Sequence, residues 1–414
     1  MAATLVVYFQ GVPVGRLWLD ERRRFVFQYE TGWALNPKAV PLSLSLPLRV
    51  EPFEDDLPRP FFSNLLPEAA IRQAVARKLG ISEQNDFALL EAIGGECAGA
   101  VSVLPEGEMP ASGREYMPLD ERQLHEVVKA LPSRPLLAGE EGVRLSLAGA
   151  QNKLPVYIED DRIFLPKGGS PSSHILKPPI RDLDGTVDNE AFCMMLAGKM
   201  GLPVPDTKVL RGMDTLFLIE RYDRRHDDQG NLVRLHQEDF CQALGVSPDQ
   251  KYESEGGPSF KRCFARLKEH SASPAADQKA LLNWVVFNLL IGNADAHAKN
   301  LALLFTDDGP RLAPFYDLLC TAIYEGVTDK LAMKVGGENR PDWIQARHWE
   351  RFAEDVGIKS WLVTATLRRM AEGIIKDAGD VSGRFEKEHS KSGIIQKILA
   401  VIKKRARGIL LILK

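Results

Sequence analysis

The first hundred residues alternate short apolar runs with turn residues. Apolar and β-branched side chains gather in short stretches that are separated by Gly11, Gly15 and a run of three arginines at 22–24. This pattern predicts a meander of β-strands followed by helices. The predicted strands cover residues 4–10, 16–20, 25–30 and 101–104, and the predicted helices cover residues 68–79 and 82–91.

The remainder of the chain changes from predicted strands to predicted helices. The strands cover residues 154–158, 162–165, 173–177, 207–211 and 215–221, with a helix at 189–201. Beyond Gln237 nearly everything is predicted to be helical, apart from a short strand pair near 301–315. A β-rich front followed by an α-rich back predicts an α+β architecture. We expect four parts, namely 1–105, a linker or helix at 106–138, a second β-rich part at 139–236, and a helical part at 237–414.

Composition places the chain among soluble proteins of more than one domain. It has 414 residues, of which 44% are hydrophobic and 26% are charged. With 53 Lys and Arg against 56 Asp and Glu, the net charge is −3, so binding to a polyanion would require a local basic patch. Five scattered cysteines predict buried free thiols. We find no signal-peptide pattern, and the longest apolar stretch, 280–292, is too short to span a bilayer, so we expect a cytoplasmic protein that does not contact membranes.

The densest chemical signal lies between residues 292 and 317. Asp295 and Asn300 are five residues apart on one predicted loop, and Asp317 follows just past the predicted strand pair. Phosphoryl transfer needs a carboxylate that orients and deprotonates the acceptor hydroxyl, together with hard oxygen ligands for Mg²⁺. The spacing is that of the D-x-x-x-x-N kinase catalytic loop, and Asp317 fits the metal-binding aspartate. The alternative for each residue alone is a helix cap or a turn.

The front half contains no P-loop and no G-x-G-x-x-G motif. Residues 144–153 are rich in Gly and Ala, so their backbone N–H groups could approach phosphate oxygens, and Lys153 adds charge. A flexible loop is the other interpretation. Lys177 ends a predicted strand as a kinase strand lysine would, and Glu190 could be its partner on a helix. A lysine at a strand end is otherwise usually solvated.

Several other residues have plain structural interpretations. His174 and His236 lie in apolar contexts, and Trp284 and Phe287 have the helical spacing of core residues. Residues 391–414 hold seven basic side chains and no acid, with isoleucines at helical spacing. This segment predicts an amphipathic basic helix that either docks by its apolar stripe or makes an auxiliary contact with DNA.

Seven segments together resemble the HipA family, the serine/threonine kinase toxins of bacterial toxin–antitoxin pairs. They are residues 64–68, 146–153, 174–177, 220–224, 237–239, 295–300 and 316–317. The resemblance covers nearly the whole chain in order. It implies a kinase-like two-lobed fold, with a β-rich N-terminal lobe and a mostly α-helical C-terminal lobe that carries the catalytic loop.

The resemblance also implies a role for each matching residue. Asp295 would be the catalytic base, and Asn300 and Asp317 would hold Mg²⁺. ATP would be bound by Ala148, Gly149, Ala150, Gln151, Asn152 and Lys153 of a nucleotide loop, by Lys177, His297 and Lys299 near the phosphates, by Glu220, Arg221 and Tyr222 at the adenine-side hinge, and by Tyr316. Asn152, where some relatives have an acid, and Tyr222, which replaces a phenylalanine, depart mildly from the family pattern.

Ser146 occupies the place of the family's autophosphorylated serine, whose modification displaces the nucleotide loop. A phosphate there adds about −1.5 to −2 charges beside an anionic ligand, so ejection of the loop is electrostatically reasonable. The resemblance further implies a helix-turn-helix antitoxin like HipB, operator DNA bound through that complex, and an aminoacyl-tRNA synthetase, chiefly glutamyl, as substrate. Translation would stop, and growth arrest or persistence would follow.

Two other functions remain open from the sequence. The chain could be a catalytically idle subunit of an antitoxin–DNA repressor complex, or a small-molecule kinase with a similar catalytic loop. The presence of Asp295, Asn300 and Asp317 favours an active kinase over the idle subunit.

Overall fold

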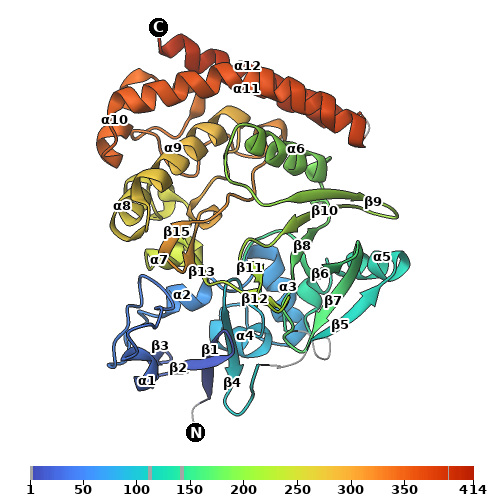
Figure 1. Cartoon of the computed structure of the whole chain (residues 1–414), viewed down its shortest axis with the longest axis vertical. Helices are drawn as coiled ribbons and strands as arrows, with labels where there is room; N and C mark the ends of the chain where they lie inside the picture. The colour runs from blue at the N-terminus through green and yellow to red at the C-terminus, as the bar shows by residue number, and fades with distance from the viewer. Residues whose placement is uncertain (1–2, 111–113, 140–143, 390) are drawn as a thin grey trace.

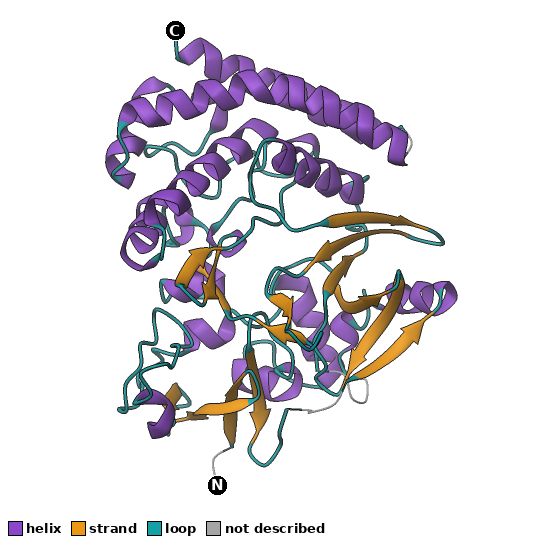
Figure 2. Ribbon diagram, in the orientation of Figure 1, coloured by secondary structure: helices purple, strands orange, loops and turns teal. Residues whose placement is uncertain are grey.

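A computed structural model describes residues 3–110, 114–139, 144–389 and 391–414. The N-terminal half is rich in strands and the C-terminal half is built mainly of helices, and the two halves lie at opposite ends of the molecule (Figures 1 and 2). The predicted α+β architecture is therefore confirmed.

The front domain (residues 4–105) is a four-stranded antiparallel sheet covered by short helices. Its strand order is β3-β2-β1-β4. The strands are β1 (Thr4–Phe9), β2 (Val12–Leu19), β3 (Phe25–Tyr29) and β4 (Val101–Pro105), and the helices are α1 (Thr31–Ala34), α2 (Arg59–Ser63), α3 (Ala69–Leu79) and α4 (Asp86–Ile93). Alternating apolar residues of the strands, such as Leu5, Val7 and Phe27, are fully buried and form the core of this domain.

A six-stranded antiparallel sheet follows, with strand order β5-β7-β6-β8-β10-β9. Its strands are β5 (Glu115–Leu119), β6 (Leu154–Glu159), β7 (Arg162–Lys167), β8 (His174–Lys177), β9 (Thr207–Arg211) and β10 (Thr215–Glu220). The segment 106–138, which the sequence predicts as a linker or helix, contains the edge strand β5 as well as helix α5 (Glu121–Ala130). This strand is short, contains Pro118 and has no fully buried residue, so its sequence pattern is weak.

The helical lobe is organised around the long buried helix α9. Its helices are α7 (Phe240–Ala243), α8 (Phe260–His270), α9 (Pro274–Ile291), α10 (Ala346–Val356), α11 (Ser360–His389) and α12 (Gly393–Ile412), and α6 (Thr186–Lys199) packs against them from the preceding part. Two small sheets complete the fold, namely β11 (Arg224–His226) with β12 (Leu232–Arg234), and β13 (Gln237–Asp239), β14 (Ala302–Thr306) and β15 (Gly309–Leu312).

The strand pair predicted near 301–315 is confirmed, since β14 pairs with β15, and β13 joins it as a third strand. The helical character expected for the rest of this lobe is wrong in one segment. Residues 313–345 are not helical but run as an irregular segment with two short 3₁₀ turns. Prolines and glycines interrupt this segment, and its backbone polar groups find partners in turns and in neighbouring loops instead of a helix.

The structural interpretations of single residues are confirmed. Trp284 and Phe287 are buried in the core, and His236 is buried with Nε2 2.9 Å from the Leu42 carbonyl. His174 is half-buried and its ring lies 2.8 Å from the Ser173 hydroxyl. All five cysteines are buried and free.

The C-terminal helix α12 docks by its apolar stripe. Ile394, Ile395, Ile398 and Ile402 are buried in the core of the helical lobe, and α12 lies beside α11 along the top of Figure 1. Lys397, Lys403, Lys404 and Arg407 remain on the exposed side of this helix. In the part of the chain that the structure describes, no helix combines the length and the apolar character needed to cross a bilayer.

Candidate active site

The predicted catalytic loop begins where α9 ends. Gly292 ends this helix with φ +75°, and a Cβ there would lie 2.8 Å from Cγ1 of Val401 on α12, so the close packing of the two helices requires glycine. The Asn293 side chain then organises the loop. Its amide donates to Oδ1 of Asn288 (2.8 Å), and its own Oδ1 accepts the backbone N–H of Asp295 (3.1 Å).

The structure brings Asn300 and Asp317 together. The Asn300 amide donates to Oδ2 of Asp317 (3.2 Å), and its Oδ1 accepts the backbone N–H of His297 (3.1 Å). Asp317 has a φ of +52°, which is unusual for an aspartate and is typical of backbone held in place by its surroundings. Asp295 is exposed, and its Oδ1 accepts a hydrogen bond from the Tyr252 hydroxyl (2.7 Å).

Lys177 reaches the same place from the six-stranded sheet. Its Nζ lies 2.7 Å from Oε1 of Glu190 on α6 and also donates to Oδ1 of Asp317. Only 5% of the Lys177 side chain is exposed. A lysine of the β-rich part and an aspartate of the helical lobe therefore face each other across the junction of the two parts.

Charge pairing offsets the cost of burying these groups. Burial alone would raise the pKa of Asp317, but Lys177 and Lys153 outweigh it and hold the pKa at about 2. Burial would likewise lower the pKa of Lys177, but Asp317 and Glu190 raise it above its usual value. Both groups are thus charged at neutral pH, and Asp317 offers an ionised carboxylate that can bind a cation.

The predicted nucleotide loop lies against the front domain. Gly149, with φ +113°, pairs with Pro67, and its carbonyl accepts the backbone N–H of Glu68 (3.1 Å). Lys153 folds back so that its Nζ donates to the Ala148 carbonyl (2.6 Å). A loop with a glycine at positive φ and with small side chains can present its backbone N–H groups to an anion.

The other residues of this loop lie around the same turn. Ala150 is exposed, the Gln151 amide donates to the Pro178 carbonyl (3.2 Å), and the half-buried Asn152 oxygen has no partner among the described residues. Ser146 is fully buried, and its hydroxyl donates to the Leu65 carbonyl (2.7 Å).

The predicted hinge divides into exposed and buried residues. Glu220 is exposed at the end of β10, whereas the Arg221 guanidinium is buried and paired with Asp223 (2.8 Å) and Glu96 (3.4 Å). The Arg221 side chain is therefore fully occupied within the protein, and its backbone N–H and carbonyl bond to the Ser173 carbonyl (2.9 Å) and the Arg224 N–H (3.2 Å).

Two tyrosines connect the hinge to the catalytic loop. The Tyr222 ring stacks on Tyr316 with 5.8 Å between ring centroids, and the Tyr316 hydroxyl donates to the Lys299 carbonyl (2.7 Å). Tyr222 and Tyr316 thus join the second β-rich part to the helical lobe at the site.

Lys299 and His297 precede Asn300 on the catalytic loop, and both side chains have protein partners of their own. The Lys299 ammonium is buried and contacts Asn64 Oδ1 (2.6 Å) and Asp239 Oδ2 (2.7 Å). His297 is buried edge-to-face against Tyr252, and burial lowers its pKa to about 4, so the ring is neutral at pH 7. The carboxylates of Asp239 and Glu68 lie beside the Lys299 ammonium and balance its charge.

Sequence reasoning did not assign roles to Tyr252, Lys251 and Glu68. Tyr252 contacts Asp295, and Lys251 contacts Glu68 (2.8 Å). The segment 64–68 carries part of the family resemblance, but nothing in its spacing shows that it meets residues nearly two hundred positions away.

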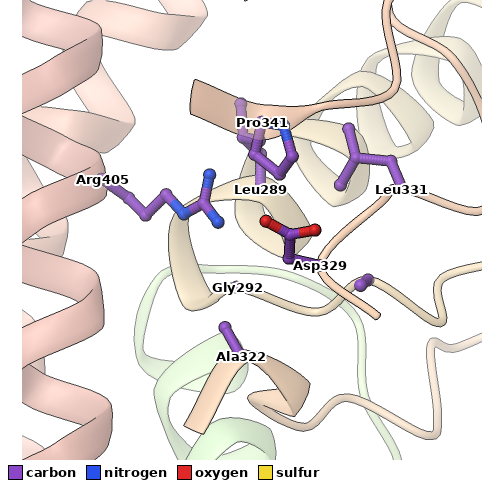
Figure 3. A pocket seen from close by; sticks show the side chains of 8 residues that line it. Leu289, Gly292, Ala322, Asp329, Leu331, Pro341 and Arg405 are labelled. Atoms are coloured by element: carbon purple, nitrogen blue, oxygen red, sulfur yellow. The ribbon is translucent and has the colours of Figure 1, made fainter. Parts of the chain in front are cut away.

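A small cavity lies behind the catalytic loop rather than at the Lys177–Asp317 pair. It is lined by the end of α9, the 322–331 segment and Arg405 of α12, whose side chain extends toward Asp329 (Figure 3). The space there is too closely filled to admit a ligand.

Comparison with known proteins agrees with this geometry. Residues 5–104 match the HipA N-terminal domain and residues 145–379 match the HipA-like C-terminal domain. The fold and the paired lysine and aspartate at the junction of two lobes define a kinase-like protein. The chain belongs to the HipA family of kinase toxins.

Two relatives and one solved structure illustrate the match. A putative kinase of Sinorhizobium fredii, Y4mE, is 44% identical over 91% of this chain and 93% of its own length. The serine/threonine-protein kinase toxin HipA of Shewanella oneidensis is 31% identical over 91% of this chain and 89% of its own. A solved structure of HipA from Shewanella oneidensis, in complex with HipB and operator DNA, has a TM-score of 0.84, 29% identity, and coverage of 99% of this chain and 96% of that one. The two-lobed kinase-like fold is thereby confirmed.

Proposed function

We propose that this protein is an ATP- and Mg²⁺-dependent protein serine/threonine kinase that acts as the toxin of a toxin–antitoxin pair. The observation that carries the proposal is the convergence of Lys177, Asn300 and Asp317 from three separate segments onto one point. Each has the chemical character that phosphoryl transfer needs there, namely a fixed cation and two oxygen-bearing side chains.

Asn300 and Asp317 would hold the Mg²⁺. Among the described residues, no group of three or more His, Cys, Asp or Glu side chains could hold a metal by itself. An Asn–Asp pair suits Mg²⁺ all the same, because this ion usually takes one or two protein ligands and completes its shell with phosphate oxygens and water. When bound, Mg²⁺ neutralises charge on the phosphates of ATP.

The chain's own residues would perform the remaining steps. Lys177, kept in place by Glu190, would contact the ATP phosphates, and the backbone of the 148–153 loop would cradle them. Asp295 would orient the acceptor hydroxyl and take its proton as the hydroxyl oxygen bonds to the γ-phosphorus. The bond from that phosphorus to the β–γ bridging oxygen breaks, and ADP leaves.

Autophosphorylation of Ser146 would switch the kinase off. The support is that Ser146 is buried, with its hydroxyl bonded to the Leu65 carbonyl, in a strip of chain that leads directly into the nucleotide loop. A phosphate does not fit in that position and would carry about −1.5 to −2 charges, so the strip must leave.

This regulation predicts a loss of nucleotide affinity. Protein that is fully phosphorylated at Ser146 is expected to bind ATP at least tenfold more weakly than the unmodified protein, measured by calorimetric titration. Equal affinities would contradict the displacement of the loop.

The partners follow from the relatives. The Shewanella oneidensis structure contains HipA, HipB and operator DNA, which supports a helix-turn-helix antitoxin and an operator for this chain as well. For the substrate we propose an aminoacyl-tRNA synthetase, chiefly glutamyl, with arrest of translation, growth arrest and persistence as consequences. The exposed basic side chains of α12 are suited to an auxiliary contact with DNA phosphates.

The experiment is phosphoproteomics on cells that express either the natural chain or Asp295→Ala. The proposal predicts a protein serine or threonine that is phosphorylated only with the natural chain, on a synthetase. Phosphorylated metabolites without a protein acceptor would identify a small-molecule kinase. Identical phosphorylation with both chains would identify a catalytically idle subunit.

A further inference from the structure

Glu68 of the front domain lies where three segments of the kinase part meet. It directly precedes α3, and only 11% of its side chain is exposed. Its backbone N–H donates to the Gly149 carbonyl, its Oε2 accepts from Lys251 Nζ at 2.8 Å, and its Oε1 lies 3.7 Å from Lys299 Nζ. One residue thus contacts the nucleotide loop, the catalytic loop and the segment that carries Tyr252.

The first connection leads into the catalytic loop through Lys299. This lysine lies between Asp295 and Asn300 in sequence and is one of the most deeply buried charges of the molecule. Asn64, Asp239 and Glu68 surround its ammonium, and two of these three come from the front domain. The front domain therefore holds the catalytic loop by its buried cation.

The second connection leads to Asp295 through the 251–252 segment. Glu68 pairs with Lys251, and the next residue, Tyr252, donates its hydroxyl hydrogen bond to Asp295 and packs its ring against His297. The far side of this segment is also fixed, because the Glu253 backbone N–H donates to the Ala332 carbonyl (3.0 Å). Loss of the Glu68 charge would free the near side of the segment, next to Asp295.

The carboxylate of Glu68 is fully ionised. Burial alone would raise its pKa, but Lys299 and Lys251 outweigh burial and hold the pKa at about 2. The contacts are therefore charge-assisted in the working pH range of an enzyme, and such contacts between largely buried groups are sensitive to the loss of either partner.

We propose that Glu68 is a positioning residue for phosphoryl transfer. Its carboxylate holds the catalytic loop in place through Lys299 and holds Asp295 in place through Lys251 and the neighbouring Tyr252. Its backbone N–H connects these contacts to the nucleotide loop. This proposal rests on the proposed kinase function. The front domain thereby supplies a part of the catalytic machinery, although no front-domain side chain contacts Asn300 or Asp317 through a hydrogen bond among the described residues.

The variant Glu68→Gln separates the two kinds of contact. Glutamine keeps the size of the side chain and the backbone N–H that holds Gly149, but it removes the charge that holds Lys251 and Lys299. We expect kcat to fall roughly ten- to a hundredfold, because small misplacements of reacting groups have effects of this size, while KM for ATP stays within about twofold.

A matched control is Asp86→Asn. Asp86 is also 11% exposed, lies in the front domain and pairs with Arg72, but both partners belong to that domain. This variant weakens a buried ion pair of equal exposure without touching the kinase part. We expect thermal stability to fall for both variants and kcat to fall for Glu68→Gln only.

A double-mutant cycle tests the route through Lys251. If Glu68 acts through this lysine, the two single variants disable the same route. The fold-loss of kcat in Glu68→Gln/Lys251→Gln is then clearly smaller than the product of the fold-losses in the two single variants. Losses that multiply independently would overturn this route. Equal kcat for Glu68→Gln and the natural chain, or an equal loss for Asp86→Asn, would overturn the whole proposal.

Amide hydrogen exchange gives a measurement that does not depend on catalysis. We expect faster exchange at 295–300 and 251–257 in Glu68→Gln than in Asp86→Asn and the natural chain. If the natural chain transfers no phosphate, the proposed kinase function is wrong. Faster exchange in Glu68→Gln alone would still show that Glu68 holds these two segments in place. Unchanged exchange would overturn that role whatever the activity.

Discussion

At the scale of single residues, the site depends on one lysine between two carboxylates. Lys177 contacts Glu190 and Asp317; Lys177 and Glu190 are each only 5% exposed, whereas the Asp317 side chain is 34% exposed. A buried charge without its partner is costly, whereas neutralising both members of a pair is often tolerated. The same three residues therefore serve both the stability of the lobe junction and the proposed chemistry.

This arrangement predicts a partial rescue of stability. Lys177→Met leaves Glu190 and Asp317 without their shared cation and is expected to lower the free energy of unfolding by about 3–5 kcal/mol. The double variant Lys177→Met/Glu190→Gln is expected to regain part of that loss, since one carboxylate no longer needs a partner. Denaturant unfolding measures the stability of the single and the double variant. Neither variant is expected to transfer phosphate. A double variant that is less stable than Lys177→Met would contradict this account.

The sequence was informative where the chemistry is local. Asp295, Asn300 and Asp317 follow one another with fixed spacing, and Lys177 ends a β-rich run, so all four could be proposed in advance. The environment of Lys299 could not, because its partners Asn64, Glu68 and Asp239 are far from it in sequence. Long-range pairing of charges leaves no periodic signal.

At the scale of elements, the strip of chain that leads into the nucleotide loop is fixed at two points and turned by one glycine. The strip 144–149 pairs with the front domain at Glu96 and Pro67, and Gly149 then turns with φ +113°. The amphipathic pattern of α12 and the apolar run in the second half of α9 were both visible in the sequence. The strand β5 and the irregular run at 313–345 were not, because their form depends on neighbours rather than on local pattern.

Substitution of Gly149 by alanine tests the function of this loop. A Cβ would strain the positive φ and lie 2.5 Å from Lys153 Nζ, which now holds the Ala148 carbonyl. We expect KM for ATP to rise severalfold, with a smaller effect on kcat. The control is Gly107→Ala, which imposes a similar strain at φ +92° in a turn with no close neighbours. An equal rise in KM for both variants would contradict the role of the loop.

At the scale of the whole molecule, the front domain and the helical lobe share a polar buried interface. Glu238 of β13 accepts hydrogen bonds from the Ser43 hydroxyl (2.5 Å) and the Leu44 backbone N–H (3.0 Å). Burial raises the pKa of Glu238 to about 8, despite these hydrogen bonds. The folded protein therefore keeps this carboxyl protonated at neutral pH.

The raised pKa makes this interface dependent on pH. In the unfolded chain Glu238 titrates near pH 4.3, so between about pH 4 and pH 8 only the unfolded state releases the proton. The protonated Glu238 carboxyl therefore contributes its full stabilisation below about pH 4. That contribution is lost as the pH rises from about 4 to 8, by at most about 1.4 kcal/mol per pH unit. Glu238→Gln imitates the protonated form, so its stability relative to the natural chain should increase from pH 5 to pH 8. Parallel stability curves in denaturant titrations would contradict this prediction.

The most direct measurement of the central claim is Mg²⁺-dependent transfer of labelled γ-phosphate by the purified protein. We compare the natural chain with Asp295→Asn and with Asp308→Asn, an exposed aspartate in the turn between β14 and β15. The account predicts transfer by the natural chain and by Asp308→Asn, and a loss of about a hundredfold or more in Asp295→Asn. Transfer by Asp295→Asn at the rate of the natural chain would contradict it.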